Sequence, residues 1–185
     1  MKKKQTNPFQ FTLTRITRTM YFLLGFFALS IALFDSGNLI TREAVIDRWI
    51  LCSALLAVNT LFWYLAVRDD AKIKASKLMI TGLAVATLVF AGFMTYWERG
   101  MASTSTILYV LPLIIIATLK NRHALIAVAT LSASTYSLAA VKYFNDFFNE
   151  GFRIQLYSSI VLYSGIIFVV AWLLMIASNL RHDSK

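Results

Sequence analysis

Few side chains in this sequence have the type and spacing for chemistry. Asp146 and Glu150 are four residues apart and can meet on one helical turn, where two carboxylates bind a divalent cation weakly. No third ligand accompanies them, so we expect solvated charges there. His123 and His182 have no Cys, His or carboxylate partners at the spacing that a metal site needs.

The sequence is equally poor in residues and motifs for nucleophilic catalysis or cofactor binding. The single cysteine, Cys52, lies in an apolar run, so a disulfide within the chain is excluded and a small buried apolar residue is expected. The sequence has no Ser–His–Asp arrangement, glycine-rich phosphate loop or metalloprotease helix. We therefore expect no catalytic, cofactor-binding or metal-binding residue, and a protein that is not an enzyme.

Long apolar runs make up most of the chain, so any ligand-binding site must be built from the elements that they form. Of its 185 residues, 58% are hydrophobic and 15% charged, whereas soluble domains are about half apolar and about a quarter charged. A transmembrane helix needs roughly 20 apolar residues, while membrane-barrel strands have about 10 and alternate with polar ones. We predict an all-α, polytopic membrane protein with six transmembrane helices: 19–34, 49–67, 78–97, 104–119, 124–141 and 154–177.

Two short segments, 1–18 and 178–185, flank this predicted domain of residues 19–177. The basic start resembles a signal peptide, but it lacks a small-residue cleavage pattern and five more runs follow, so we expect an uncleaved anchor. Residues 8–18 mix apolar and polar positions. They form either an interfacial segment or a ragged start of the first helix.

Basic residues alternate between the two sides of the predicted spans. The first side holds the N-terminus, the 68–77 loop, the 120–123 turn and the tail, and carries 13 basic and 3 acidic residues. The other side carries 5 basic and 6 acidic residues. Since positive residues stay on the cytoplasmic side, we predict a bacterial inner-membrane protein with both termini in the cytoplasm. The net charge of +9 then reflects contact with anionic lipid, and no nucleic-acid partner is expected.

The fourth and fifth spans form a distinctive pair. Pro112 lies in the middle of the fourth span, where it removes a backbone donor and predicts either a hinge or a static kink. Residues 120–123 connect the two spans so tightly that we expect an antiparallel hairpin.

The predicted spans contain no ionisable residue, which argues against pumps and ion-coupled transporters. The strongest internal polar group is Asn59, interpreted either as a hydrogen bond between helices or as a ligand contact. Small residues line several spans at packing spacing and predict helix packing within the chain, or a surface for a partner or a second copy. The main ones are Gly25, Ala28, Ala32, Gly82, Ala86, Ala129 and Ala133.

Aromatic residues gather at the predicted outer interface. An ordinary aromatic belt is one interpretation. The other is an extracytoplasmic lid over a ligand pocket, because the 142–153 loop is richer in phenylalanine than a belt requires. On that interpretation the ligand-binding candidates are Asn59, Trp97, Phe147 and Phe148.

Residues 103–136, STSTILYVLPLIIIATLKNRHALIAVATLSASTY, carry a resemblance. An apolar helix with a central Leu-Pro leads into a basic turn and an alanine-rich helix. This resembles the multi-helix membrane region at the N-terminus of bacterial sensor histidine kinases. The resemblance implies a two-component sensor module, which passes a membrane or extracytoplasmic signal to a cytoplasmic kinase. The phosphoacceptor context and nucleotide motif are missing from this sequence, so we expect no kinase activity.

Two alternatives remain open. A chain of six spans is also similar to the substrate-binding subunit of energy-coupling-factor vitamin transporters, whose first helix docks on a partner through small residues. The Gly25, Ala28 and Ala32 stripe would then meet a transporter partner. The third interpretation is a scaffold subunit of a membrane complex.

Overall fold

The computed structural model describes residues 8–68, 73–98, 100, 103–147 and 153–183. The regular structure in these ranges is entirely helical, which confirms the predicted all-α fold class for them. The elements are α1 (Pro8–Ser36), α2 (Arg42–Arg68), α3 (Ile73–Trp97), the 3₁₀ helix η2 (Thr104–Tyr109), α4 (Val110–Ala117), α5 (Arg122–Phe147) and α6 (Arg153–Asp183).

Five of the described helices, α1, α2, α3, α5 and α6, are long and apolar enough to cross a membrane. Their outer faces carry many large apolar side chains, and Phe22, Phe26 and Val161 are each 72% exposed. In the most apolar stretch of α6 only 11% of the residues are buried. Exposed apolar surface on this scale fits contact with lipid rather than water, so the helices indicate a membrane protein.

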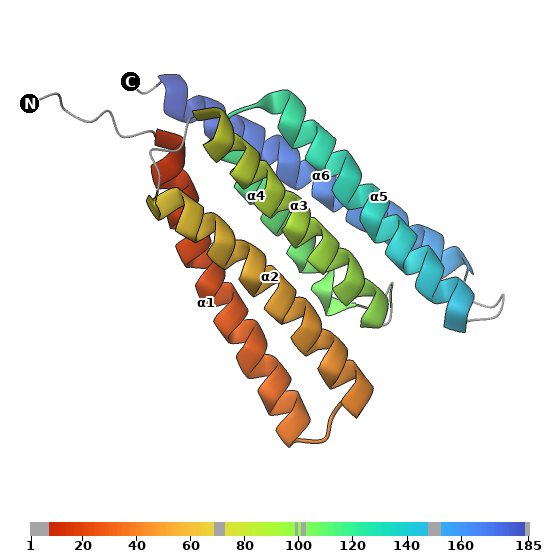
Figure 1. The fold of residues 1–185 in the computed structure, drawn as a ribbon. Coiled ribbons are helices and arrows are strands. Elements are labelled where there is room, and N and C mark those ends of the chain that lie inside the picture. The colour runs from red at the N-terminus through yellow and green to blue at the C-terminus, as the bar shows by residue number, and fades with distance from the viewer. Residues whose placement is uncertain (1–7, 69–72, 99, 101–102, 148–152, 184–185) are drawn as a thin grey trace, which may run out of the picture. The chain divides into compact units, whose positions relative to one another are not determined.

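The chain divides into two compact units, Met1–Leu83 and Ala84–Lys185, and α3 contributes residues to both. In the first unit α1 and α2 pack as a hairpin (Figure 1). The turn between them contains Asn38 with φ of 52°, a left-handed conformation that asparagine tolerates. Two side-chain amides join the helices: Asn59 Nδ2 donates to the Thr17 carbonyl at 3.0 Å, and Gln10 Nε2 donates to the Ala66 carbonyl at 2.6 Å.

Helix α1 is longer than the apolar run that predicted it. It begins at Pro8, a residue suited to the first turn because its missing N–H needs no partner there. Residues 8–18 are therefore helical and continuous with the first predicted span, and their place relative to the membrane interface stays a prediction. Thr17 in this stretch is fully buried, and its hydroxyl donates to the Leu13 carbonyl at 3.1 Å.

In the second unit α5 packs against α6, and the shorter α4 packs against both. The predicted fourth span is a composite of η2 and α4. A 3₁₀ helix rises about 2.0 Å and an α-helix about 1.5 Å per residue, so these 14 residues reach about 24 Å, less than a bilayer core of about 30 Å. The fourth element is thus apolar but shorter than the other five.

The connection between α4 and α5 is as tight as predicted. It consists of residues 118–121, with Lys120 at φ of 53°. Asn121 then caps α5, since its Oδ1 accepts from the backbone N–H groups of His123 at 3.1 Å and Ala124 at 3.3 Å. Because four residues turn the chain between two packed helices, α4 and α5 form the expected hairpin.

Candidate functional site

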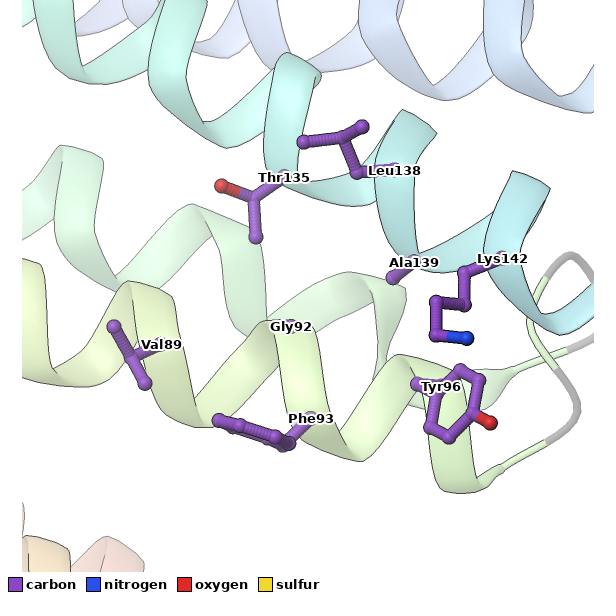
Figure 2. A pocket seen from close by; sticks show the side chains of 8 residues that line it. All are labelled: Val89, Gly92, Phe93, Tyr96, Thr135, Leu138, Ala139 and Lys142. Atoms are coloured by element: carbon purple, nitrogen blue, oxygen red, sulfur yellow. The ribbon is translucent and has the colours of Figure 1, made fainter.

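An apolar groove runs between α3 and α5 in the second unit (Figure 2). Its volume is about 410 Å³, within the roughly 300–1,000 Å³ of small-molecule pockets. Nearly all its surface is apolar. The lining residues are Val89, Gly92, Phe93 and Tyr96 from α3, and Thr135, Leu138, Ala139 and Lys142 from α5.

The groove follows from matched spacing on the two helices. On each helix the first and last lining positions are seven apart, from Val89 to Tyr96 and from Thr135 to Lys142. Residues three, four and seven apart share one face of an α-helix, so each helix presents a continuous stripe. Two turns rise roughly 10 Å, which sets the length of the groove.

Apart from the Thr135 hydroxyl, the polar side chains of the groove lining lie at one end. Figure 2 shows Lys142 and Tyr96 together there, with the lysine side chain extended toward the tyrosine ring. Lys142 Nζ lies 5.9 Å from the ring centroid, within cation–π range, and 3.0 Å from Asp146 Oδ2. The Tyr96 hydroxyl donates to the same Asp146 oxygen at 2.7 Å. One end therefore offers a cation, a carboxylate and a phenol beside an apolar channel.

Asp146 lies at the end of α5, beyond the apolar run 124–141. The hydrogen bonds from Tyr96 and then from Lys142 lower the pKa of Asp146 below its ordinary value of 3.8. The same carboxylate raises the pKa of Lys142. Both groups are charged near neutral pH, so the polar end of the groove carries a matched pair of opposite charges.

Aromatic rings surround this polar end. Tyr143 meets Tyr96 at a centroid distance of 6.3 Å and Phe147 at 4.8 Å, while Phe93 meets Trp97 at 5.6 Å. Neither Trp97 nor Phe147 is in the groove lining: Trp97 contacts the lining residue Phe93, and Phe147 reaches the lining residue Tyr96 only through Tyr143. Because α5 continues to Phe147, the first half of the predicted 142–153 loop is helical.

Gly100, shortly after the end of α3, makes a close contact with Tyr143 of α5. Gly100 has φ of 58°, and a Cβ there would lie 2.8 Å from Cβ of Tyr143. Nearby, the Glu98 carboxylate accepts hydrogen bonds from the hydroxyls of Ser103, Thr104 and Ser105 at the start of η2. The glycine lets the backbone approach Tyr143 of α5, and the carboxylate joins the end of α3 to the start of η2.

The other predicted ligand residues lie elsewhere. Asn59 is fully buried in the first unit, bonded to Thr17, and does not line the groove. Phe148 lies outside the described residues. Pro112 is buried in the first turn of α4, just after the change from the 3₁₀ to the α-helical form. A first turn tolerates a missing N–H, and the hinge assignment stays a prediction.

The small-residue stripes fall into two groups. Ala129 and Ala133 are buried in the second unit, and a Cβ on Gly82 would lie 3.1 Å from Phe62 Cζ, so these positions serve close packing within the chain. On α1, Gly25 and Ala32 are exposed and Ala28 is partly buried, and a Cβ on Gly25 would have no neighbour within 4 Å. Ala86 is partly buried.

Few polar groups line the groove. Away from the charged end, the one hydroxyl-bearing residue of the lining is Thr135, and its neighbours in the lining are apolar. Among the described residues no group of three or more His, Cys, Asp or Glu could hold a metal ion, and Glu150 lies outside them. Cys52 is buried.

Sequence reasoning missed Gly92, Thr135, Ala139, Lys142 and Tyr96 as a group. Their signal is present in the sequence as two stripes with the same spacing, each with one small residue in its middle, Gly92 or Ala139, and each ending in a polar residue. No protein-family model, no curated protein and no solved structure matches this chain, so the comparisons assign it to no known family.

Proposed function

We propose that this chain is a non-catalytic membrane sensor module that takes an apolar, chain-like ligand from the bilayer into the α3–α5 groove. The observation that carries the proposal is the chemistry of the groove: an apolar channel about two turns long that ends at Lys142, Asp146 and Tyr96. Such a site matches an amphipathic molecule with its tail along the channel and its polar group at the charged end.

The ligand class follows from the groove's opening. Val89, Phe93 and Leu138 are between 49% and 71% exposed, so the channel is open along its side rather than enclosed. An open apolar channel on a membrane helix pair exchanges its occupant directly with surrounding lipid. A polar vitamin or sugar would find few partners for its hydroxyl and amide groups along this surface.

The proposed arrangement in the membrane is six spans with both termini in the cytoplasm. The uneven distribution of basic residues supports it. In this topology Lys142 and Asp146 lie at the outer interface, at headgroup level, where a ligand's polar end would lie. The turn at residues 118–121 then faces the cytoplasm, where a kinase partner would read the state of the helices.

A sensor must transmit occupancy from the groove to the cytoplasmic end. Ser178 lies beside Ala117, Asn121 and Arg122 in a small hollow of about 80 Å³ in the second unit, and provides a reporter position there. In a Cys52→Ala background, Ser178→Cys can be labelled with a maleimide in vesicles of phosphatidylethanolamine and phosphatidylglycerol. We expect Ala139→Phe, which fills the groove, to change the labelling rate severalfold.

The matched control is Ala54→Phe, the same substitution at an exposed position of α2. It should leave the Ser178→Cys labelling rate unchanged. Equal labelling rates in the parent, groove-filled and control proteins would reject transmission from the groove and favour a scaffold role. A C-terminal reporter found outside the cytoplasm would reject the proposed topology.

A second candidate function is the substrate-binding subunit of an uptake transporter. The exposed Gly25 and Ala32 on α1 favour it, because small residues on a lipid-facing surface let a partner helix approach closely. Replacing Gly25, Ala28 and Ala32 together with leucine should then abolish recovery of the transporter partner in pull-downs. Unchanged recovery would reject this candidate.

A further inference from the structure

Four buried hydroxyl groups in the second unit lie outside the groove lining. Thr95 of α3, Tyr109 of η2, and Ser132 and Tyr136 of α5 are each fully buried. None of their hydroxyl oxygens reaches a hydrogen-bond partner among the described residues. Buried hydroxyls in proteins are nearly always bonded, so four in one unit need an explanation.

Other buried threonines in this protein satisfy their hydroxyls locally. Thr17 donates to the Leu13 carbonyl at 3.1 Å, and Thr87 donates to the Ala84 carbonyl at 2.8 Å. Thr95 lies two turns after Thr87 in the same helix and makes no such bond. The missing bond at Thr95 is therefore not a general feature of the buried threonines in these helices.

The side chains that carry these hydroxyls are neighbours. The ring of Tyr136 lies edge-on to that of Tyr109 at a centroid distance of 5.8 Å and close to that of Tyr163 at 5.2 Å. Thr95 is near enough to Tyr109 to interact with it, but the two hydroxyls do not reach hydrogen-bond geometry. Ser132 precedes Tyr136 by one turn, and a tyrosine side chain on a helix leans over that turn.

An occupant of this cluster must be small, neutral, and able both to donate and to accept hydrogen bonds. Each hydroxyl is itself a donor and an acceptor, and no charged side chain belongs to the cluster. Water meets these requirements, and buried waters typically make about three hydrogen bonds to polar groups that otherwise lack partners. A hydroxyl left without any partner would cost about 1–3 kcal/mol.

We infer that Thr95, Tyr109, Ser132 and Tyr136 form an internal hydration site, in which ordered water joins α3, η2 and α5. Gly92 borders both sites, because a Cβ there would lie 4.0 Å from the Tyr109 hydroxyl and the residue also lines the groove.

The sign of a stability change tests this inference. The four single variants are Tyr109→Phe, Tyr136→Phe, Ser132→Ala and Thr95→Val, each of which removes a hydroxyl and little else. If water bridges the hydroxyls, each variant shifts the unfolding equilibrium in bicelles toward the unfolded state by about two- to tenfold. If the cluster is dry, removing an unpaired hydroxyl leaves the equilibrium unchanged or shifts it toward the folded state, and the inference fails.

Matched controls remove exposed hydroxyls from the same unit. Tyr157→Phe on α6 and Ser134→Ala on α5 should leave the equilibrium unchanged, since both side chains are exposed. Hydroxyl-radical footprinting gives a second measurement, because internal water delivers radicals to adjacent side chains. Tyr109 and Tyr136 should be modified while the buried Met20 of the first unit is not. Protection of both tyrosines would overturn the inference.

Discussion

Gly92 of α3 lies directly against the side-chain methyl group of Thr135 in α5: a Cβ on the glycine would be 2.8 Å from Thr135 Cγ2. Real Cβ atoms do not approach other atoms so closely. The missing side chain therefore sets the separation of the two helices that form the groove, and Figure 2 shows both residues facing each other in its lining.

Gly92→Ala should lower the free energy of unfolding by about 1–3 kcal/mol, because the added methyl group forces the helices apart. Thr135→Ser removes the opposing methyl group and should restore most of that loss in the double variant. The measurement is a double-mutant cycle of unfolding equilibria in bicelles. Additive effects in the double variant would contradict the contact.

Gly25→Ala provides the matched control for this cycle. Nothing lies within 4 Å of a Cβ at Gly25, and alanine favours helix by roughly 1 kcal/mol over glycine. The same substitution should therefore be neutral or stabilising at Gly25 and destabilising at Gly92. Equal effects at both positions would show that helix propensity, rather than the Thr135 contact, decides the outcome.

Asn59→Leu should lower the free energy of unfolding by about 1 kcal/mol, since hydrogen bonds between membrane helices average about 0.6 kcal/mol and reach about 1.7. The variant loses the bond from Asn59 Nδ2 to the Thr17 carbonyl. The same unfolding assay measures the loss, with ligand retention as a second readout. Full stability combined with lost ligand would instead support the predicted ligand contact.

Asp146 should give the groove end a pH dependence at acid pH. Its pKa is lowered below 3.8 by Tyr96 and Lys142, so its contribution to stability is complete above the unfolded-state pKa and is lost as pH falls through the folded-state value. The difference in unfolding free energy between the parent protein and Asp146→Asn should stay constant above about pH 5 and shrink below about pH 4. A difference that is constant to pH 2 would contradict the hydrogen bonds to Tyr96 and Lys142.

The helices were largely predictable because apolar length alone indicates them. Their ends were less so: α1 begins at Pro8 and α5 continues to Phe147, since helices extend past the apolar run into polar and charged residues. The 3₁₀ form of residues Thr104–Tyr109 was missed, because hydropathy does not distinguish it from an α-helix.

The groove could not be predicted because it depends on which helix faces pair. Gly92 and Thr135 lie 43 positions apart in the sequence, and neither is unusual in its own helix. Asn59, the most conspicuous polar residue of the predicted spans, proved to bond Thr17 within a hairpin. Polarity therefore pointed to Asn59, which makes a packing contact between α1 and α2. The groove instead depends on the missing side chain of Gly92, which polarity does not indicate.

Retention of an apolar ligand through purification tests the central claim most directly. Native mass spectrometry of the detergent-extracted protein should detect an amphipathic molecule bound to the parent and to Ala54→Phe, but not to Ala139→Phe, whose new ring occupies the α3–α5 groove. If the parent retains nothing, or if Ala139→Phe retains the same molecule in the same amount, the groove is not the binding site and the proposed function is wrong.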